Sequence, residues 1–395
     1  MPTPDLAPDL DLVCLSHLRW NFVFQRPQHL LTRFAAQRRV FYIEEPVVTD
    51  GEATMDVASH HGVTIATPHL PPRLASGPER DAALRRLLDA WLARNDVRRF
   101  VAWYYTPMAL AFSAHLTPEL VVYDCMDELS AFAQAPPALR AFETALFGRA
   151  DVVFTGGRSL YEAKRAHHPN VHAMPSSVDV AHFAKARDAE WDPDDQQAIG
   201  RPRLGYFGVI DERMDLPLLA AVADARPDWQ IVMLGPVVKI DPGTLPRRPN
   251  LHYLGAKRYE DLPAYIGYWN VALMPFARNE STRFISPTKT PEYLAAGKPV
   301  VSTSIRDVVR PYGRRGLVRI ADDPAAFVQA CAEAMSEDPV ARMAAADAFL
   351  KTTSWDRTWS RMCQLMALAQ KGRRPAARAA AMPVSATVVR SQVSA

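Results

Sequence analysis

The chain has 395 residues, which is long enough for two domains of ordinary size, each with its own hydrophobic core. Apolar residues make up 48% of it and charged residues 23%, as is usual for a globular protein. Its 46 lysines and arginines are interleaved with 43 aspartates and glutamates, so the net charge is only +3 and a dedicated nucleic-acid-binding protein is not expected.

The first half of the chain alternates short apolar stretches with helical patterns. Short buried strands that alternate with helices indicate parallel β-α-β units and doubly wound sheets, so the fold class is α/β. Strands are predicted at 12–16, 40–44, 63–67, 100–104, 120–124 and 151–155, and helices at 28–37, 78–94 and 138–148.

A polar, acidic and proline-containing segment at 184–201 follows, without any hydrophobic period, and is typical of a linker between domains. The alternation then resumes, with strands at 204–209, 230–235, 271–275 and 300–303 and helices at 324–336, 339–351 and 355–370. We therefore predict a first domain at 1–185, a linker at 186–201, a second domain at 202–354, a final amphipathic helix at 355–370 and a disordered tail at 371–395.

The four cysteines are far apart and form no Cys-x-x-Cys pair, so neither a zinc site nor a disulfide framework is indicated. No apolar run approaches the roughly 20 residues that cross a bilayer. The first eight residues have neither a charged leader nor an apolar stretch, so we expect no signal peptide and a cytoplasmic location. The fingerprints of dinucleotide-binding dehydrogenases and of P-loop enzymes are missing from the sequence, which argues against both classes.

The most informative motif covers residues 286–302 (SPTKTPEYLAAGKPVVS). Two overlapping Ser/Thr-Pro pairs mark a helix start, and a glycine marks its end before the next strand. Lys289 and Glu292 would lie near the helix N-terminus, where the lysine could hold phosphate and the glutamate could accept two hydrogen bonds from a diol such as ribose. A surface helix with one lysine and one glutamate would show the same pattern.

The spacing from Lys289 through Glu292 to Gly297 resembles the donor-site signature of GT-B glycosyltransferases of the retaining GT4 family, the glycosyl transferases group 1. In that family the glutamate grips the ribose of a nucleotide-sugar. Three more segments resemble the family in the same order. They are 175–183, which closes its first domain, 205–220, whose basic residue binds the donor pyrophosphate, and 251–265, which cradles the base.

Two features depart from the family pattern. The usual pair of glutamates is incomplete, because Phe284 stands where the first is expected and the nearest carboxylate, Glu280, is out of register. We interpret the motif as a Ser-Pro-x-Lys-x-x-Glu variant in which Lys289 compensates. The first loop, at 16–28, also has no glycine pair, so close approach of its backbone to a phosphate is less assured.

The resemblance implies two Rossmann-like domains that face each other across a cleft, with the final helix packed on the first domain. It also implies a hexosyltransferase-type enzyme that moves a sugar from a nucleotide-diphosphate sugar, of UDP or GDP, to a glycan or lipid-linked acceptor. Retention of configuration, no metal or other cofactor, and a role in cell-envelope or exopolysaccharide synthesis follow from the same resemblance. Candidate donor-binding residues are Glu292, Gly208, Arg213, Lys289, Ser286 and Thr288.

Side chains that follow strands of the first domain supply candidates for the acceptor side. Asp127 lies just past the strand at 120–124, together with Asp124 and Glu128, and could act as a base if these carboxylates converge, or simply cap a helix. A lone histidine is more often structural, and aromatic residues often only pack a core. Candidate catalytic residues are Arg213, Lys289, Asp127 and His17, and candidate acceptor-binding residues are Arg19, Trp20, Tyr104 and Tyr105.

Two other functions stay open, namely a GT-B-fold nucleotide-sugar epimerase and a non-catalytic, nucleotide-binding partner subunit that the missing glutamate would suit. The arginine-rich helix at 78–94 could touch the inner face of the cell membrane peripherally. An ordinary amphipathic helix packed on its own sheet is the favoured explanation of its pattern.

Overall fold

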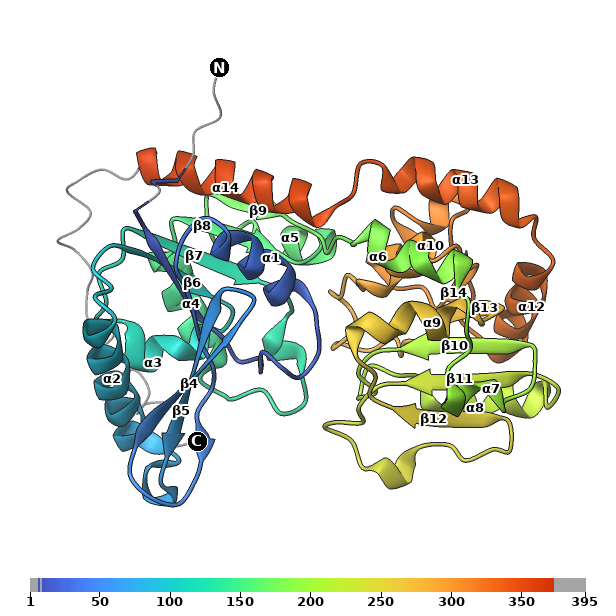
Figure 1. Ribbon diagram of the computed structural model, residues 1–395, viewed down its shortest axis with the longest axis horizontal. Helices are drawn as coiled ribbons and strands as arrows, with labels where there is room; N and C mark the ends of the chain where they lie inside the picture. The colour runs from blue at the N-terminus through green and yellow to red at the C-terminus, as the bar shows by residue number, and fades with distance from the viewer. Residues whose placement is uncertain (1–5, 8, 373–395) are drawn as a thin grey trace. The chain divides into compact units, whose positions relative to one another are not determined.

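The computed structural model describes residues 6–7 and 9–372, which form two compact units (Figure 1). The first unit holds the described residues up to Gly156, then Leu160–Met174, and the described residues from Thr358 onward. The second unit holds Gly157–Ser159 and Pro175–Arg357. The predicted disordered tail lies outside the described residues from residue 373 onward.

The first unit is built on a nine-stranded sheet in the order β3-β5-β2-β1-β6-β7-β8-β9, with β4 paired to β5. All of its pairings are parallel except that of β4 with β5. The central strands are buried along their whole length, as expected of a parallel sheet covered on both faces. The strands are β1 (Asp11–Leu15), β2 (Val40–Ile43), β3 (Val47–Val48), β4 (Thr54–His60), β5 (Val63–Leu70), β6 (Phe100–Tyr104), β7 (Leu120–Cys125), β8 (Val152–Thr155) and β9 (Val171–Ala173).

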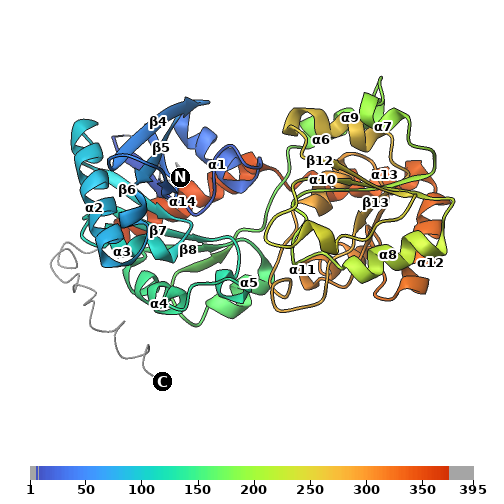
Figure 2. The same ribbon diagram turned by 90° about the horizontal axis from the view of Figure 1, so that it is seen from below.

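Helices cover both faces of this sheet (Figure 2). On one face, Phe34 of the first helix meets Trp359 of the last helix with 5.8 Å between ring centroids. The final helix thus packs on the first unit although it begins in the second. The helices are α1 (Arg26–Ala35), α2 (Gly77–Arg94), α3 (Leu110–Ser113), α4 (Leu139–Arg149), α5 (Arg158–Lys164) and α14 (Trp355–Gly372).

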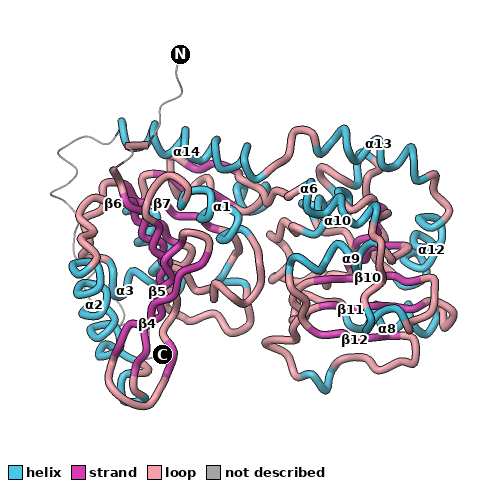
Figure 3. Tube along the Cα trace, in the orientation of Figure 1, coloured by secondary structure: helices cyan, strands magenta, loops and turns pink. Residues whose placement is uncertain are grey.

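The second unit has a six-stranded parallel sheet in the order β12-β11-β10-β13-β14-β15. Figure 3 shows three of these strands, β10, β11 and β12, side by side. Its strands are β10 (Arg203–Phe207), β11 (Gln230–Leu234), β12 (Leu251–Gly255), β13 (Val271–Met274), β14 (Val300–Ser302) and β15 (Arg319–Ile320). On one face α8 contacts α12, and on the other α10 contacts α6 and α13. The longer helices are α6 (Val180–Ala184), α8 (Leu216–Ala225), α9 (Leu262–Gly267), α10 (Lys289–Ala295), α12 (Pro324–Met335) and α13 (Pro339–Leu350). Each unit is therefore a doubly wound α/β domain, which confirms the predicted fold class.

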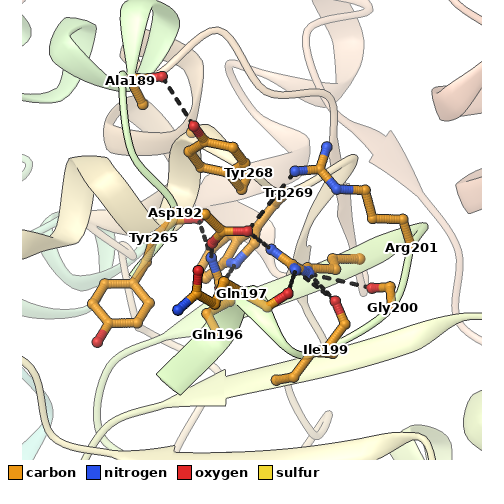
Figure 4. Close-up of polar contacts among 12 residues, drawn as sticks. Ala189, Asp192, Gln196, Gln197, Ile199, Gly200, Arg201, Tyr265, Tyr268 and Trp269 are labelled. Carbon is orange, nitrogen blue, oxygen red and sulfur yellow. Dashed lines mark hydrogen bonds and ion pairs between the residues drawn. The ribbon is translucent and has the colours of Figure 1, made fainter. Parts of the chain in front are cut away.

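The segment predicted as a linker, 186–201, is a fixed part of the second unit (Figure 4). Gln196 is fully buried, accepts a hydrogen bond from Trp269 Nε1 at 2.8 Å and donates one to Asp192 Oδ1 at 2.9 Å. Asp192 also forms an ion pair with Arg203 Nη1 at 2.5 Å. The polar side chains of this segment bond one another and the α9 region, so the chain passes between the units at 156–160, 174–175 and 357–358 instead.

A buried ion pair joins three parts of the first unit. Arg26, in the first turn of α1, donates from Nε and Nη2 to both carboxylate oxygens of Asp124 in β7, at 2.8 to 3.1 Å. Its Nη1 donates to the carbonyl oxygen of Met174, just past β9, at 2.7 Å. The two side chains are 1% and 0% exposed, so Asp124 acts in holding the fold together and not as a solvent-facing base.

Removing one partner of this pair should cost far more stability than removing both. In Arg26→Met the buried Asp124 carboxylate loses its counter-ion, and we expect a loss of about 3–5 kcal/mol in the free energy of unfolding. The double variant Arg26→Met, Asp124→Leu should lose much less, because well-packed apolar side chains often replace a buried pair without penalty. Urea denaturation followed by circular dichroism measures both. Equal losses in the single and double variants would contradict this account.

Candidate functional site

Two glycines at the carboxyl ends of β10 and β11 let the backbone come close to the first turn of α10. Gly208 follows β10 with φ +132° and Gly235 follows β11 with φ +142°. A Cβ on Gly235 would overlap the carbonyl oxygen of Gly208, and a Cβ on Gly208 would overlap Cε of Lys289. Only glycine therefore allows the two strand ends and the lysine to share this space.

Lys289 is partly buried beside aromatic rings. Its Nζ lies 5.6 Å from the ring centroid of Tyr206 and 5.7 Å from that of Phe207, within the range of cation–π attraction. Burial lowers the pKa of Lys289, the charge of Glu292 raises it, and the charge of Arg213 lowers it. A cation in such a place is poised to gain an anionic partner, which would restore its pKa.

Glu292 lies one turn further along α10 and is 6% exposed. Its Oε2 is buried and has no hydrogen-bond partner among the residues that the structure describes. Burial raises the pKa of Glu292 to about 7, while the charge of Lys289 and a hydrogen bond from Thr288 lower it. Buried polar atoms in native proteins are nearly always hydrogen-bonded, so this oxygen indicates a position for a ligand that donates hydrogen bonds.

Arg213 lies in the loop between β10 and α8, and its side chain is 25% exposed. Asp211 accepts from Arg213 Nε at 2.9 and 3.1 Å and from Nη2 at 2.7 Å. The guanidinium is therefore held in one orientation at the same strand end as Lys289. Ser286 and Thr288 are partly buried in the segment just before α10.

The structure thus brings together the residues predicted for the donor, and their binding roles stay predictions. Sequence reasoning missed Asp211, although its spacing of two residues from a candidate arginine could have indicated an ion pair. Phe284, in place of the expected glutamate, is partly buried with the Arg283 guanidinium 5.2 Å from its ring centroid.

In the first unit, Arg19 and Trp20 are used to fix the first loop. Glu44 accepts from the backbone N–H of Trp20 at 2.7 Å and from Arg19 Nη1 at 3.0 Å. Trp20 is 2% exposed and donates from Nε1 to His60 Nδ1 at 3.1 Å. Neither side chain is presented mainly to solvent, and their contacts with an acceptor stay predictions.

Tyr104 and Tyr105 are also buried, at 2% and 1% exposure, so core packing accounts for both rings. The hydroxyl of Tyr104 lies 3.0 Å from Ser113 Oγ. His17 follows β1 and Asp127 follows β7 in partly exposed loops at the carboxyl ends of the sheet. Their catalytic roles stay predictions.

The three carboxylates after the predicted strand at 120–124 do not form one cluster. Asp124 pairs with Arg26, while Glu128 Oε2 pairs with Lys164 Nζ at 2.7 Å. Lys164 also pairs with Glu143 Oε2 at 2.8 Å and is itself buried. This lysine therefore ties the loop that carries Asp127 to α4.

The apolar side chains of α2 point into their own unit, since Leu84, Leu88, Trp91 and Leu92 are all buried. Among the described residues no helix is long and apolar enough to cross a membrane. Across the same part of the chain, no group of three or more His, Cys, Asp or Glu side chains could hold a metal ion.

Comparison with known proteins bears on the second unit directly. Residues 201–337 match the family model described as glycosyl transferases group 1. We call residues 201–337 the group 1 domain after this match. It contains every residue predicted for the donor, from Gly208 to Glu292.

The other comparisons are made with the whole chain. TuaH of Bacillus subtilis, whose name assigns it provisionally to teichuronic acid biosynthesis as a glycosyltransferase, is 26% identical over 263 residues. The match covers 61% of this chain and 64% of that relative, so less than two thirds of the relative's length is matched.

Solved structures show the fold. Sucrose-phosphate synthase from Thermosynechococcus elongatus matches with a TM-score of 0.71 at 14% identity, over 92% of this chain and 100% of that one. A trehalose-6-phosphate protein from E. coli, bound with UDP-2-fluoro glucose, matches with a TM-score of 0.66 at 12% identity, over 90% and 99%. An α,α-trehalose-phosphate synthase (UDP-forming) from Burkholderia vietnamiensis matches with a TM-score of 0.64 at 14% identity, over 90% and 96%. The fold is the α/β fold with parallel sheets found in GT-B glycosyltransferases.

Within the group 1 domain, Gly208→Ala should destabilise the protein more than Gly255→Ala. Both glycines have positive φ, +132° and +71°, but a Cβ on Gly255 would meet no atom within 4 Å, whereas one on Gly208 would overlap Lys289. The backbone penalty, about 1–3 kcal/mol, should be smaller at Gly255, because +71° is close to the left-handed helical conformation that other residues can adopt and +132° is not. At Gly208 the overlap with Lys289 adds to it. Thermal unfolding compares the variants, and equal melting temperatures would contradict this account.

Glu292→Gln should stabilise the group 1 domain at pH 8 and change it little at pH 5. The pKa of Glu292 rises on folding from its usual 4.5 to about 7. Between these values the folded state binds the extra proton, so stability falls as the pH rises through this window, by up to about 3 kcal/mol. A neutral amide removes that dependence. Urea denaturation at both pH values tests this, with the exposed Glu280→Gln as the control that should show no pH-dependent difference.

Proposed function

We propose that this protein is a glycosyltransferase that moves a sugar from a nucleotide-diphosphate sugar to a glycan or lipid-linked acceptor. The observation that carries the proposal is the buried, unpartnered Oε2 of Glu292, beside Lys289 and Arg213, in a group 1 domain. An ionised carboxylate can accept hydrogen bonds from both hydroxyls of a ribose. Two neighbouring cations suit the charge of a diphosphate.

The proposed chemistry is mainly electrostatic. Negative charge builds on the leaving diphosphate as the anomeric bond breaks, and cations already held in place stabilise that charge without reorganisation. Lys289 and Arg213 would do this work in place of a metal ion. We propose retention of configuration, with a phosphate oxygen of the leaving group taking the acceptor proton and no covalent adduct on the protein.

The subgroup and the biological setting are part of the same proposal. We assign the chain to a GT4-like subgroup whose donor motif is Ser-Pro-x-Lys-x-x-Glu, read here from Ser286 to Glu292. The match to TuaH supports a role in cell-envelope or exopolysaccharide synthesis, and we propose a cytoplasmic location. The E. coli structure bound with UDP-2-fluoro glucose supports UDP as a first choice of base. Contact with the inner face of a membrane would have to be electrostatic, because α2 buries its apolar side chains.

A second candidate function rests on Phe284. If the missing glutamate were needed for the sugar, the domain would bind nucleotide without transferring it, as a partner subunit does. Lys289 in the same motif argues for transfer, because it lies at the strand end where the leaving diphosphate would develop its charge.

Calorimetric titration with UDP, GDP and their common sugars, without added metal, tests the donor site. We expect one nucleotide to bind saturably, and Glu292→Ala to weaken that binding by more than tenfold because the ribose loses its acceptor. Binding that needs added metal would contradict the proposed role of the two cations. No binding of any nucleotide by folded protein would overturn the transferase proposal, and binding without turnover in acceptor screens would favour the partner subunit.

A further inference from the structure

Asp211 accepts hydrogen bonds from both the side chain and the backbone of Arg213, which is a candidate donor-site residue. Its carboxylate accepts from Nε and Nη2 of Arg213 and from the backbone N–H of the same residue at 3.0 Å. Asp211 is itself 4% exposed, whereas the Arg213 side chain is 25% exposed. The carboxylate is therefore an internal support, and the arginine is the group that reaches the surface of the site.

The backbone of this loop is fixed independently of the ion pair. Ile210 forms a bridge to Val237 on one side, and Met214 forms a bridge to Phe276 on the other. The carbonyl oxygen of Arg213 accepts from the N–H of Ala277 at 2.8 Å. The Arg213 side chain still has to be ordered, and fixing its rotamers costs about 2 kcal/mol of conformational entropy.

Asp211 holds the guanidinium of Arg213 along one edge, through Nε and Nη2. An arginine bound along one edge loses less freedom when it meets a second anion than an unheld arginine would.

Asp211 also acts on the neighbouring lysine. Arg213 and Lys289 are two cations at one strand end, and Arg213 lowers the pKa of Lys289 while Asp211 raises it. The groups facing Lys289 are thus Glu292 and Asp211 on the acidic side and Arg213 on the basic side.

We propose that Asp211 is a positioning residue that fixes the orientation of Arg213, so that the site prefers nucleoside diphosphates over monophosphates. This inference rests on the proposed donor site. The effect of Asp211 should fall on the phosphates and spare the nucleoside, because the residue acts on the ligand only through Arg213.

Titrating the protein with UDP and UMP, or with GDP and GMP if guanine is the base bound, tests the proposal. In Asp211→Asn we expect diphosphate affinity to fall about tenfold, the scale of one charge-assisted hydrogen bond, and monophosphate affinity to change less than twofold. The control is Asp228→Asn, which changes another aspartate that lies two residues from its arginine partner. There Arg226 Nε donates to Asp228 Oδ1 at 2.8 Å on the exposed surface. It should leave both affinities unchanged.

The outcomes separate this inference from the donor site itself. A merely structural role for Asp211 would weaken both nucleotides alike, and an unchanged or increased preference for the diphosphate would overturn the proposal. Asp211→Glu covers the case in which the asparagine variant fails to fold. It keeps the charge but lengthens the side chain, and it too should reduce the diphosphate preference. If the wild-type protein binds no nucleotide, the result contradicts the proposed donor site itself and not only the role of Asp211.

Discussion

The close approach of α10 to the carboxyl end of β10 is the constraint on which the candidate site depends. Gly208 has no Cβ, so Lys289 can lie directly over the strand end, and Gly235 allows the neighbouring strand to end at the same level. The first turn of α10 then has to place a lysine and a glutamate where their side chains are largely shielded from solvent. Every unusual property of the site follows from that burial, including the lowered pKa of Lys289 and the raised pKa of Glu292.

Charge balance makes this burial tolerable. Asp211 and Glu292 carry two negative charges when ionised, and Arg213 and Lys289 carry two positive ones. A set of four charges with no net charge can be held near the protein surface at modest cost, whereas two cations alone would repel each other. The two cations differ, however, in how closely each meets its carboxylate. Arg213 has its counter-ion at hydrogen-bond distance, while Lys289 and Glu292 influence each other without a direct ion pair. The part of the site that is incompletely paired is the part where we place the donor.

The sequence predicted the buried strands better than it predicted the exposed strand and the limits of the two domains. Strand β6 begins and ends at the predicted residues, because an apolar run in a parallel sheet is buried on both faces and shows plainly in the sequence. Strand β4 was not predicted because nearly all of its residues are exposed and it pairs only with β5. The segment at 186–201 resembled a linker because it is polar, yet Gln196 and Asp192 find partners that only the folded unit supplies. The candidate donor residues lie in two motifs, at 205–220 and 286–302, and could be named in advance. Arg26 and Asp124 lie far apart in the sequence and meet only in the fold.

The two principal charge clusters show how a structural ion pair differs from a binding site. In the Arg26–Asp124 pair both side chains are wholly buried, and carboxylate, guanidinium and the Met174 carbonyl satisfy one another. Nothing in that arrangement calls for a further molecule. At the start of α10 the burial is similar, but Glu292 keeps an oxygen without a partner, and such an atom costs free energy until a ligand supplies a donor. Such a free-energy cost is tolerated where the binding of a ligand offsets it. The unpaired oxygen of Glu292 lies close to Lys289 at the carboxyl end of a strand, and this combination, more than the presence of charge alone, is the reason we propose the donor site there.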